Sequence, residues 1–391
     1  MSQNFDVIII GGGIMGCATA FQLAGRGLKV ALLEKKSIGD GPTGKSSAII
    51  RQHYSNELTA RMAYHSLHVF QNFDEMVGGE CGFNRCGFLL VAAGADKAGL
   101  TANVAMQQGV GIETALVSTD DIHELAPGLK IEHDLAAAYE PQSGYADPYL
   151  TVTSYAQAAR RLGAKIYQDT QVTAVHMAQG KVQGVETNNG RFSAPIVLNC
   201  TGAWGAQVAQ LAGVELPIDP CRVQVSLFRR PAGHEAAHPV VADFENAIYF
   251  RPETGGLTLV GLIDPQEAYA IVDPDHFSEN VSDAFVLDSG ERLVNRYPAM
   301  AESQSVGGYA SLYAITPDWH PIVDECLAGS GFYVCSGFSG HGFKLGPAVG
   351  RMMADLVLGV EQPLFAADMF RNGRFAANEP VRGQYEYSIV G

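Results

Sequence analysis

The chain has 391 residues, of which 47% are hydrophobic and 17% are charged, and its formal net charge is −15. The length predicts two domains or one composite fold, and the composition argues against intrinsic disorder. An acidic surface repels nucleic acid and anionic membranes, and no apolar run is long enough to span a membrane, so we expect a small molecule as the partner.

The N-terminal residues predict one βαβ unit. An apolar strand over 5–10 is followed by a helix over 14–25 and a second strand over 28–34. The connecting run Gly11-Gly12-Gly13-Ile14-Met15-Gly16 fits the pattern G-x-G-x-x-G, which places a pyrophosphate at a helix N-terminus. Glu34 ends the second strand, where an acid accepts ribose hydroxyls and repels a 2′-phosphate. The residues alone predict a dinucleotide site, disfavour NADP, and leave FAD and NAD open.

The later elements indicate two kinds of structure along the chain. We expect helices over 56–76, 149–162, 281–296 and 345–358, strands over 164–167, 195–200 and 331–336, and β-rich runs over 171–187, 222–229 and a hairpin of 247–252 with 257–263.

The expected fold class is α/β, with a Rossmann-type dinucleotide-binding domain and an interleaved α+β domain built on an antiparallel sheet. Residues 1–80, 149–215 and 310–391 would form the discontinuous dinucleotide-binding domain. Residues 81–148 and 216–309 would form the substrate-binding domain.

Four blocks carry a resemblance to a known family: Asp6–Glu34, Ser46–Arg51, Asn199–Trp204 and Tyr313–Lys344. The last block contains Gly-Phe-Ser-Gly-His-Gly-Phe-Lys over 337–344, which is much more specific than the first glycines. The chain resembles the glycine oxidase / D-amino-acid oxidase superfamily, most of all sarcosine oxidases of the monomeric kind and the β subunit of the heteromeric kind. This resemblance implies FAD as the cofactor.

The resemblance also implies a set of site residues. Arg51 would bind a substrate carboxylate with help from Lys344, while His341 and Tyr313 would lie near the flavin and the substrate. From the residues alone, a solvated surface position is the more common one for an arginine such as Arg51, and a buried His or Tyr is usually a core residue. The expected FAD contacts are Gly11, Gly13, Ile14, Met15, Gly16, Glu34, Lys35, Ser46, Ser47, Ala48, Val172, Thr201, Gly202, Trp204, Gly340, His341, Gly342, Phe343 and Lys344.

Several positions depart from the family pattern. Ser311 stands where monomeric sarcosine oxidases attach the flavin through a Cys, and residues 42–44 lack the His that other relatives use, so we expect non-covalent FAD. Ala48 replaces a second family Arg. The family's oxygen-activating Lys aligns with Thr258, so the electron acceptor is either O2 or another molecule, such as a quinone, an electron-transfer protein or a partner subunit.

The expected reaction is oxidation of a carboxylate-bearing amine, such as an N-substituted glycine, by hydride transfer to FAD, giving an imine that hydrolyses. One alternative is a flavin-dependent 2-hydroxy-acid dehydrogenase, which needs a base such as His53 or His341. The other is an FAD-carrying subunit of a heteromeric amine dehydrogenase complex. The sequence is compatible with an oligomer or a partner subunit.

Three remaining patterns are weaker. The run His234-Glu-Ala-Ala-His238 matches a zinc signature, but the neighbouring prolines disfavour the helix it needs, so we expect no metal. The run 336–341 lacks the last glycine of a hydrolase elbow. The N-terminus lacks a signal-peptide pattern and the seven cysteines are scattered, which predicts a cytoplasmic protein with reduced thiols.

Overall fold

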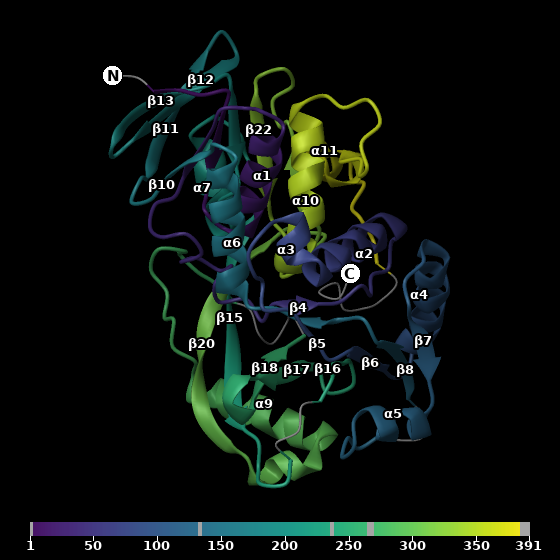
Figure 1. The fold of residues 1–391 in the computed structure, drawn as a ribbon. Helices are drawn as coiled ribbons and strands as arrows, with labels where there is room; N and C mark the ends of the chain where they lie inside the picture. The colour runs from purple at the N-terminus through teal and green to yellow at the C-terminus, as the bar shows by residue number, and fades with distance from the viewer. Residues whose placement is uncertain (1–2, 132–134, 235–237, 264–269, 384–391) are drawn as a thin grey trace.

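The structure is a computed structural model that describes residues 3–131, 135–234, 238–263 and 270–383. It contains two main sheets, one packed among most of the helices and the other at the opposite end of the molecule (Figure 1). None of the helices in these ranges is long and apolar enough to cross a membrane.

A six-stranded sheet joins the beginning, middle and end of the chain, in the order β10-β3-β2-β14-β22-β21. Neighbouring strands run parallel except for β21, which is an antiparallel edge strand. The inner strands are continuous apolar runs because both faces of the sheet are covered. Its strands are β2 (Val7–Ile10), β3 (Val30–Leu33), β10 (Lys165–Tyr167), β14 (Ile196–Asn199), β21 (Ile322–Asp324) and β22 (Phe332–Ser336).

Two different layers cover this sheet. Val7 and Ile9 pack into one core with helices α1, α2, α6 and α10, whereas Ile8 and Ile10 pack into another beneath a four-stranded sheet and α7. The bounds are α1 (Ile14–Gly25), α2 (Glu57–Gln71), α6 (Pro148–Arg161), α7 (Gly205–Gln210), α10 (Gly342–Val357), β1 (Gln3–Asn4), β11 (Val172–Ala178), β12 (Lys181–Thr187) and β13 (Gly190–Ser193).

The second main sheet has nine strands, in the order β19-β15-β18-β17-β16-β6-β8-β7, with β20 also paired to β15. Helix α9 packs on one face, at the lower end of the view in Figure 1. The strands are β6 (Phe88–Ala92), β7 (Ala115–Val117), β8 (Ala136–Glu140), β15 (Asp219–Arg229), β16 (Val240–Asp243), β17 (Ile248–Glu253), β18 (Leu257–Leu262), β19 (Ala270–Ile271) and β20 (Gln304–Ile315).

The remaining elements are short or peripheral. They are α3 (Phe73–Met76), α4 (Asp96–Val110), α5 (Thr119–Leu125), α9 (Asp283–Arg296), α11 (Gly373–Ala376), β4 (Ile49–Ile50), β5 (Asn84–Arg85) and β9 (Gly144–Tyr145), with 3-10 turns η1 (Gly202–Trp204), η2 (Thr254–Gly256), η3 (Pro298–Glu302) and η4 (Asp368–Phe370).

The fold class expected from the sequence is confirmed, and three details differ. The helix expected from residue 345 begins at Gly342 and contains Pro347, and next to it the Ala348 N–H donates to Ser66 Oγ of α2. The helix expected over 56–76 is interrupted at Asn72. The second sheet is mainly antiparallel, but β16 and β6 pair in parallel. Strand β20 runs through the expected boundary at 309/310, and the domain limits stay a prediction.

Candidate functional site

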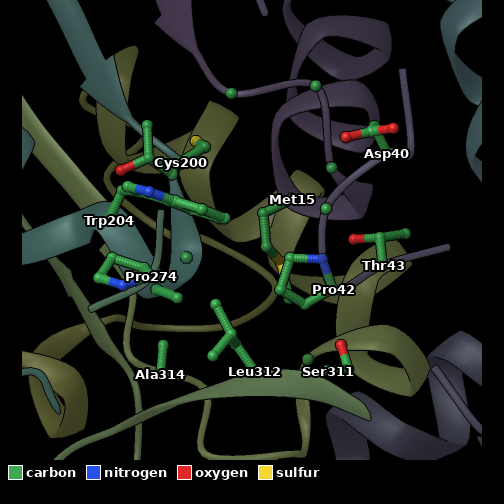
Figure 2. Close-up of a pocket in the computed structure, with 18 of the residues that line it drawn as sticks. Met15, Asp40, Pro42, Thr43, Cys200, Trp204, Pro274, Ser311, Leu312 and Ala314 are labelled. Carbon is green, nitrogen blue, oxygen red and sulfur yellow. The ribbon is translucent and has the colours of Figure 1, made fainter. Parts of the chain in front are cut away.

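A cavity of about 920 Å³ is lined by residues from both main sheets. Figure 2 shows Met15 and Pro42 on one side of it, Trp204 and Pro274 across from them, and Ser311 of β20 along the lower edge. The wall combines the loop after β2, the end of β3, the start of β11, the end of β14 and the loop before α10. The chain therefore encloses this space with segments from its beginning, middle and end.

The glycine loop after β2 leaves no room for side chains. Gly11 has φ +107°, and a Cβ there would lie 2.6 Å from the Cys200 carbonyl oxygen. A Cβ on Gly16 would lie 2.0 Å from the Gly11 carbonyl oxygen, so α1 can pack this closely only with glycine at that position. A Cβ on Gly13 would lie 2.9 Å from Thr43 Oγ1. The loop and the first turn of α1, which carries no acidic residue, form a cradle suited to an anion.

Glu34 lines the cavity, and both of its carboxylate oxygens accept hydrogen bonds. Its Oε2 accepts from the Gly12 N–H at 2.7 Å, and its Oε1 accepts from the Lys36 N–H at 2.8 Å. Lys35 Nζ lies 2.6 Å from Asp275 Oδ1 and 3.7 Å from the ring centre of Trp204. Trp204 Nε1 donates to the same carboxylate oxygen at 2.9 Å. The segment that carries Asp275 thus contacts two residues expected to bind the nucleotide.

Tyr249 and Tyr313 also line the cavity. Gly340 has φ +91°, and a Cβ there would lie 2.8 Å from the Tyr313 ring, so the absence of a side chain lets that ring pack on the glycine loop. The Tyr249 hydroxyl hydrogen-bonds with the Ser47 side chain and with Tyr313. Burial raises the pKa of Tyr249, which therefore stays protonated.

Arg51 and Lys344 form a buried cationic cluster with Tyr54 and His341. Arg51 is 5% exposed and Lys344 is 8% exposed. The Arg51 guanidinium carbon lies 4.5 Å from the Tyr54 ring centre, and Nη1 donates to the His53 carbonyl. Tyr54 Oη lies 3.4 Å from His341 Nδ1. Burial and the Arg51 charge hold the pKa of Lys344 well below its usual range.

One buried acid faces this cluster. Glu140 Oε2 accepts from the Gln52 N–H at 2.9 Å and from Ser143 Oγ at 2.6 Å. Burial raises the pKa of Glu140, although these two hydrogen bonds and Arg51 act in the opposite direction. Within the described ranges, Glu140 Oε1 has no hydrogen-bond partner. Burial of His53 and the charge of Arg51 lower the pKa of His53 to about 3, so its ring is neutral at physiological pH.

The structure brings most of the expected site residues to the cavity. Gly16, Ala48, His341 and Lys344 do not line it themselves, but each is adjacent in sequence to a lining residue. Arg51 does not line it either, and the nearest lining residue in sequence is Ser47, four positions away. The expected residues that line it are Gly11, Gly13, Ile14, Met15, Glu34, Lys35, Ser46, Ser47, Val172, Thr201, Gly202, Trp204, Tyr313, Gly340, Gly342 and Phe343.

Sequence reasoning missed Tyr54, Glu140, Tyr249 and Arg251. A signal existed for the last two, because they alternate along β17 beside a hairpin turn and so share one face of the sheet. A lone acid at the end of the apolar run Ala-Ala-Ala-Tyr was the signal for Glu140. Tyr54 follows Arg51 closely but has no distinctive pattern.

The structure also shows the surroundings of Thr258 and of His238, the last residue of the zinc-like pattern. Thr258 pairs with Pro252 of β17, so it lies on the sheet face opposite to Tyr249 and away from the cavity. His238 Nε2 lies 3.2 Å from Thr258 Oγ1, and burial lowers the pKa of His238 to about 4. The three residues between the histidines of the zinc-like pattern lie outside the described residues. In the part of the chain that is described, no three His, Cys, Asp or Glu side chains gather as a metal site requires.

Residues 6–356 match the family described as DAO: FAD dependent oxidoreductase. The chain is 26% identical to mitochondrial sarcosine dehydrogenase of Homo sapiens over 92% of its own length, but it spans only 40% of that protein. It is 25% identical to glycine oxidase of Geobacillus kaustophilus (strain HTA426), covering 91% of this chain and 94% of that one. The solved structure of L-proline dehydrogenase from P. horikoshii is similar with a TM-score of 0.89 and 28% identity, covering 97% of this chain and 100% of that one. The chain therefore belongs to the DAO family of FAD-dependent oxidoreductases.

Proposed function

We propose that this enzyme oxidises a small amine that carries a carboxylate, such as an N-substituted glycine or a cyclic amino acid. The observation that carries the proposal is the pair Arg51 and Lys344, two basic side chains that are buried near each other, with Lys344 next in sequence to the cavity-lining Phe343. A buried guanidinium is costly unless an anion accompanies it, and its planar fork suits a carboxylate. Relatives named for sarcosine, glycine and L-proline support the same substrate class.

The residues present fit FAD. The glycine cradle at Gly11 and Gly16 has no space for a Cβ. The cavity lining includes Glu34, whose carboxylate would accept ribose hydroxyls, and the aromatic Tyr313. FAD supplies the two-electron acceptor when it is bound. Ser311, which lines the cavity, stands where monomeric sarcosine oxidases attach the flavin through a Cys. A serine at this position supports non-covalent binding of FAD.

The chain contributes binding and orientation. Arg51 would hold the substrate carboxylate in two places, and Lys344 would add a second contact, so that the carbon next to the nitrogen is fixed beside the cofactor. Burial of both cations excludes water from this contact and strengthens it. The amine would react as the neutral base, so no dedicated base is required.

The hydroxy-acid alternative has less support. It requires a base for the hydroxyl proton, and His53, with a pKa of about 3, is a poor proton acceptor at neutral pH. His341 stays the candidate base for this alternative.

An acceptor other than O2 has specific support. On β18, the residues that share the face of Tyr249 are Leu257, Leu259 and Gly261, so this strand presents no lysine toward the cavity. We propose that electrons pass to a quinone, an electron-transfer protein or a partner subunit.

Anaerobic mixing tests the substrate class. The FAD-loaded protein is mixed with sarcosine, dimethylglycine, glycine, L-proline and a 2-hydroxy acid, and loss of the ~450 nm flavin band is followed. Bleaching by at least one carboxylate-bearing amine and none by the hydroxy acid is expected. Bleaching by the hydroxy acid alone would overturn the proposal.

A further inference from the structure

Two residues of strand β17 hydrogen-bond with a segment of the cavity wall. Tyr249 and Arg251 alternate along β17 and therefore share one face. Tyr249 hydrogen-bonds with the Ser47 side chain, and Arg251 Nε donates to the Ser47 carbonyl oxygen at 2.6 Å. Ser46 and Ser47 line the cavity, whereas Arg251 does not. One strand of the second sheet thus fixes both the side chain and the backbone of a residue in the cofactor wall.

The segment that Arg251 holds has a disfavoured backbone. Ala48 has φ +51°, a left-handed conformation that residues with a Cβ rarely adopt. Its N–H donates to Ser46 Oγ at 3.0 Å, and its carbonyl accepts from the Ala146 N–H at 3.0 Å. Such a conformation persists only where the surroundings impose it. The Arg251 contact on the preceding carbonyl is one of these constraints.

Arg251 is itself held in place. It is 3% exposed, and its guanidinium carbon lies 4.4 Å from the Tyr145 ring centre. Nη1 donates to the Pro252 carbonyl at 2.7 Å and Nη2 to Glu253 Oε2 at 2.8 Å. The side chain therefore makes hydrogen bonds with all three of its nitrogen atoms, and its orientation toward Ser47 is rigid.

We propose that Arg251 is a positioning residue for the flavin, acting through the Ser47 carbonyl to keep Ser46–Ala48 in the conformation that the bound cofactor needs. The inference uses the FAD site and does not depend on which substrate is oxidised. A charge-assisted hydrogen bond to a carbonyl is stronger than a neutral one, which explains why an arginine is retained in a buried position.

The test compares Arg251→Met and Arg251→Lys with the unchanged protein. In Arg251→Met we expect the Kd for FAD to rise by about tenfold or more, because a buried charge-assisted hydrogen bond is lost, together with a shift of the flavin absorption band and reduction potential. Lysine keeps one donor for the Ser47 carbonyl, so Arg251→Lys should recover part of each change. Arg229→Met is the matched control, because Arg229 is an exposed arginine of β15 that also donates to a carbonyl, that of Gly255.

A second variant separates positioning from a general loss of packing. Glycine adopts φ +51° without the Cβ penalty, so Ala48→Gly in the Arg251→Met background should restore part of the FAD affinity. If Arg251→Met does not fold, Arg251→Lys with and without Ala48→Gly gives the same comparison. FAD affinity, spectrum and potential that match those of Arg229→Met, or an Ala48→Gly effect that is the same with and without Arg251, would overturn the proposal.

Discussion

Arg51 and Lys344 lie far apart in sequence, yet burial and the Arg51 charge together hold the pKa of Lys344 well below its usual range. Arg51 follows β4, and Lys344 lies in the first turn of α10. Two basic side chains buried near each other disfavour a second positive charge, so a bound anion would stabilise the charged form of both. This relationship gives the proposed carboxylate contact its physical basis.

Carboxylate binding should therefore depend on pH. A bound carboxylate favours the ammonium form of Lys344 and raises its pKa, so binding takes up a proton when Lys344 is neutral in the free enzyme. Affinity should be highest below the lowered pKa of Lys344 and should fall as pH rises through it. Titration of the flavin absorbance with acetate across pH measures this. Lys344→Met should bind acetate more weakly, and its affinity should no longer fall over this pH range. The same fall in affinity in that variant would show that another group titrates.

The glycine cradle should be intolerant of a single methyl group. Gly16→Ala would place Cβ 2.0 Å from the Gly11 carbonyl oxygen, so the helix and the loop must move apart. We expect loss of FAD binding and a stability cost of about 1–3 kcal/mol. The control is Gly109→Ala in α4, where no atom lies within 4 Å and the gain should be about 0.5–1 kcal/mol. FAD content and thermal unfolding of both variants are the measurements, and full FAD content in Gly16→Ala would contradict the assignment.

The ion pair between Lys35 and Asp275 should slow FAD release. Asp275 contacts both Lys35 and Trp204 at the cavity, but the two charged side chains are 28% and 47% exposed, so the contribution should be about 0.2–1 kcal/mol. Asp275→Asn should release FAD faster on dilution, as followed by flavin fluorescence, and added salt should accelerate release less than in the unchanged protein. Asp288→Asn, which removes a surface ion pair with Arg292 on α9, is the control. Equal release and salt dependence in all three proteins would argue against this role.

Local sequence patterns predicted the dinucleotide unit closely. Residues 14–25 were expected to be helical and form α1, because the glycines, the apolar strands and the helix are close in sequence and mutually consistent. The helix expected from residue 345 begins at Gly342, and the hydrogen bond that Ala348 N–H donates to Ser66 Oγ in its first turns is a tertiary contact that local patterns do not predict.

The parts of the site that local patterns did not predict depend on distant contacts. Arg251 reaches Ser47 across 204 positions of sequence, and Glu140 reaches Gln52 across 88. The local patterns at Arg251 and Glu140 place each residue on a strand but do not identify its distant partner. Arg51 and Lys344 were found only through the resemblance, and the structure places them together in the protein interior.

The most direct test of the account combines Arg51→Ala with removal of the substrate carboxylate. The rate of anaerobic flavin reduction is measured with sarcosine and with dimethylamine, which lacks the carboxylate, in the unchanged protein, in Arg51→Ala and in Arg61→Ala as an exposed control on α2. In the unchanged protein and in Arg61→Ala, we expect loss of the substrate carboxylate to raise the activation free energy of flavin reduction by about 2–4 kcal/mol. In Arg51→Ala the increase should be much smaller, because the positive charge that pairs with the carboxylate is already gone. An equal carboxylate effect with and without Arg51 would contradict the central claim.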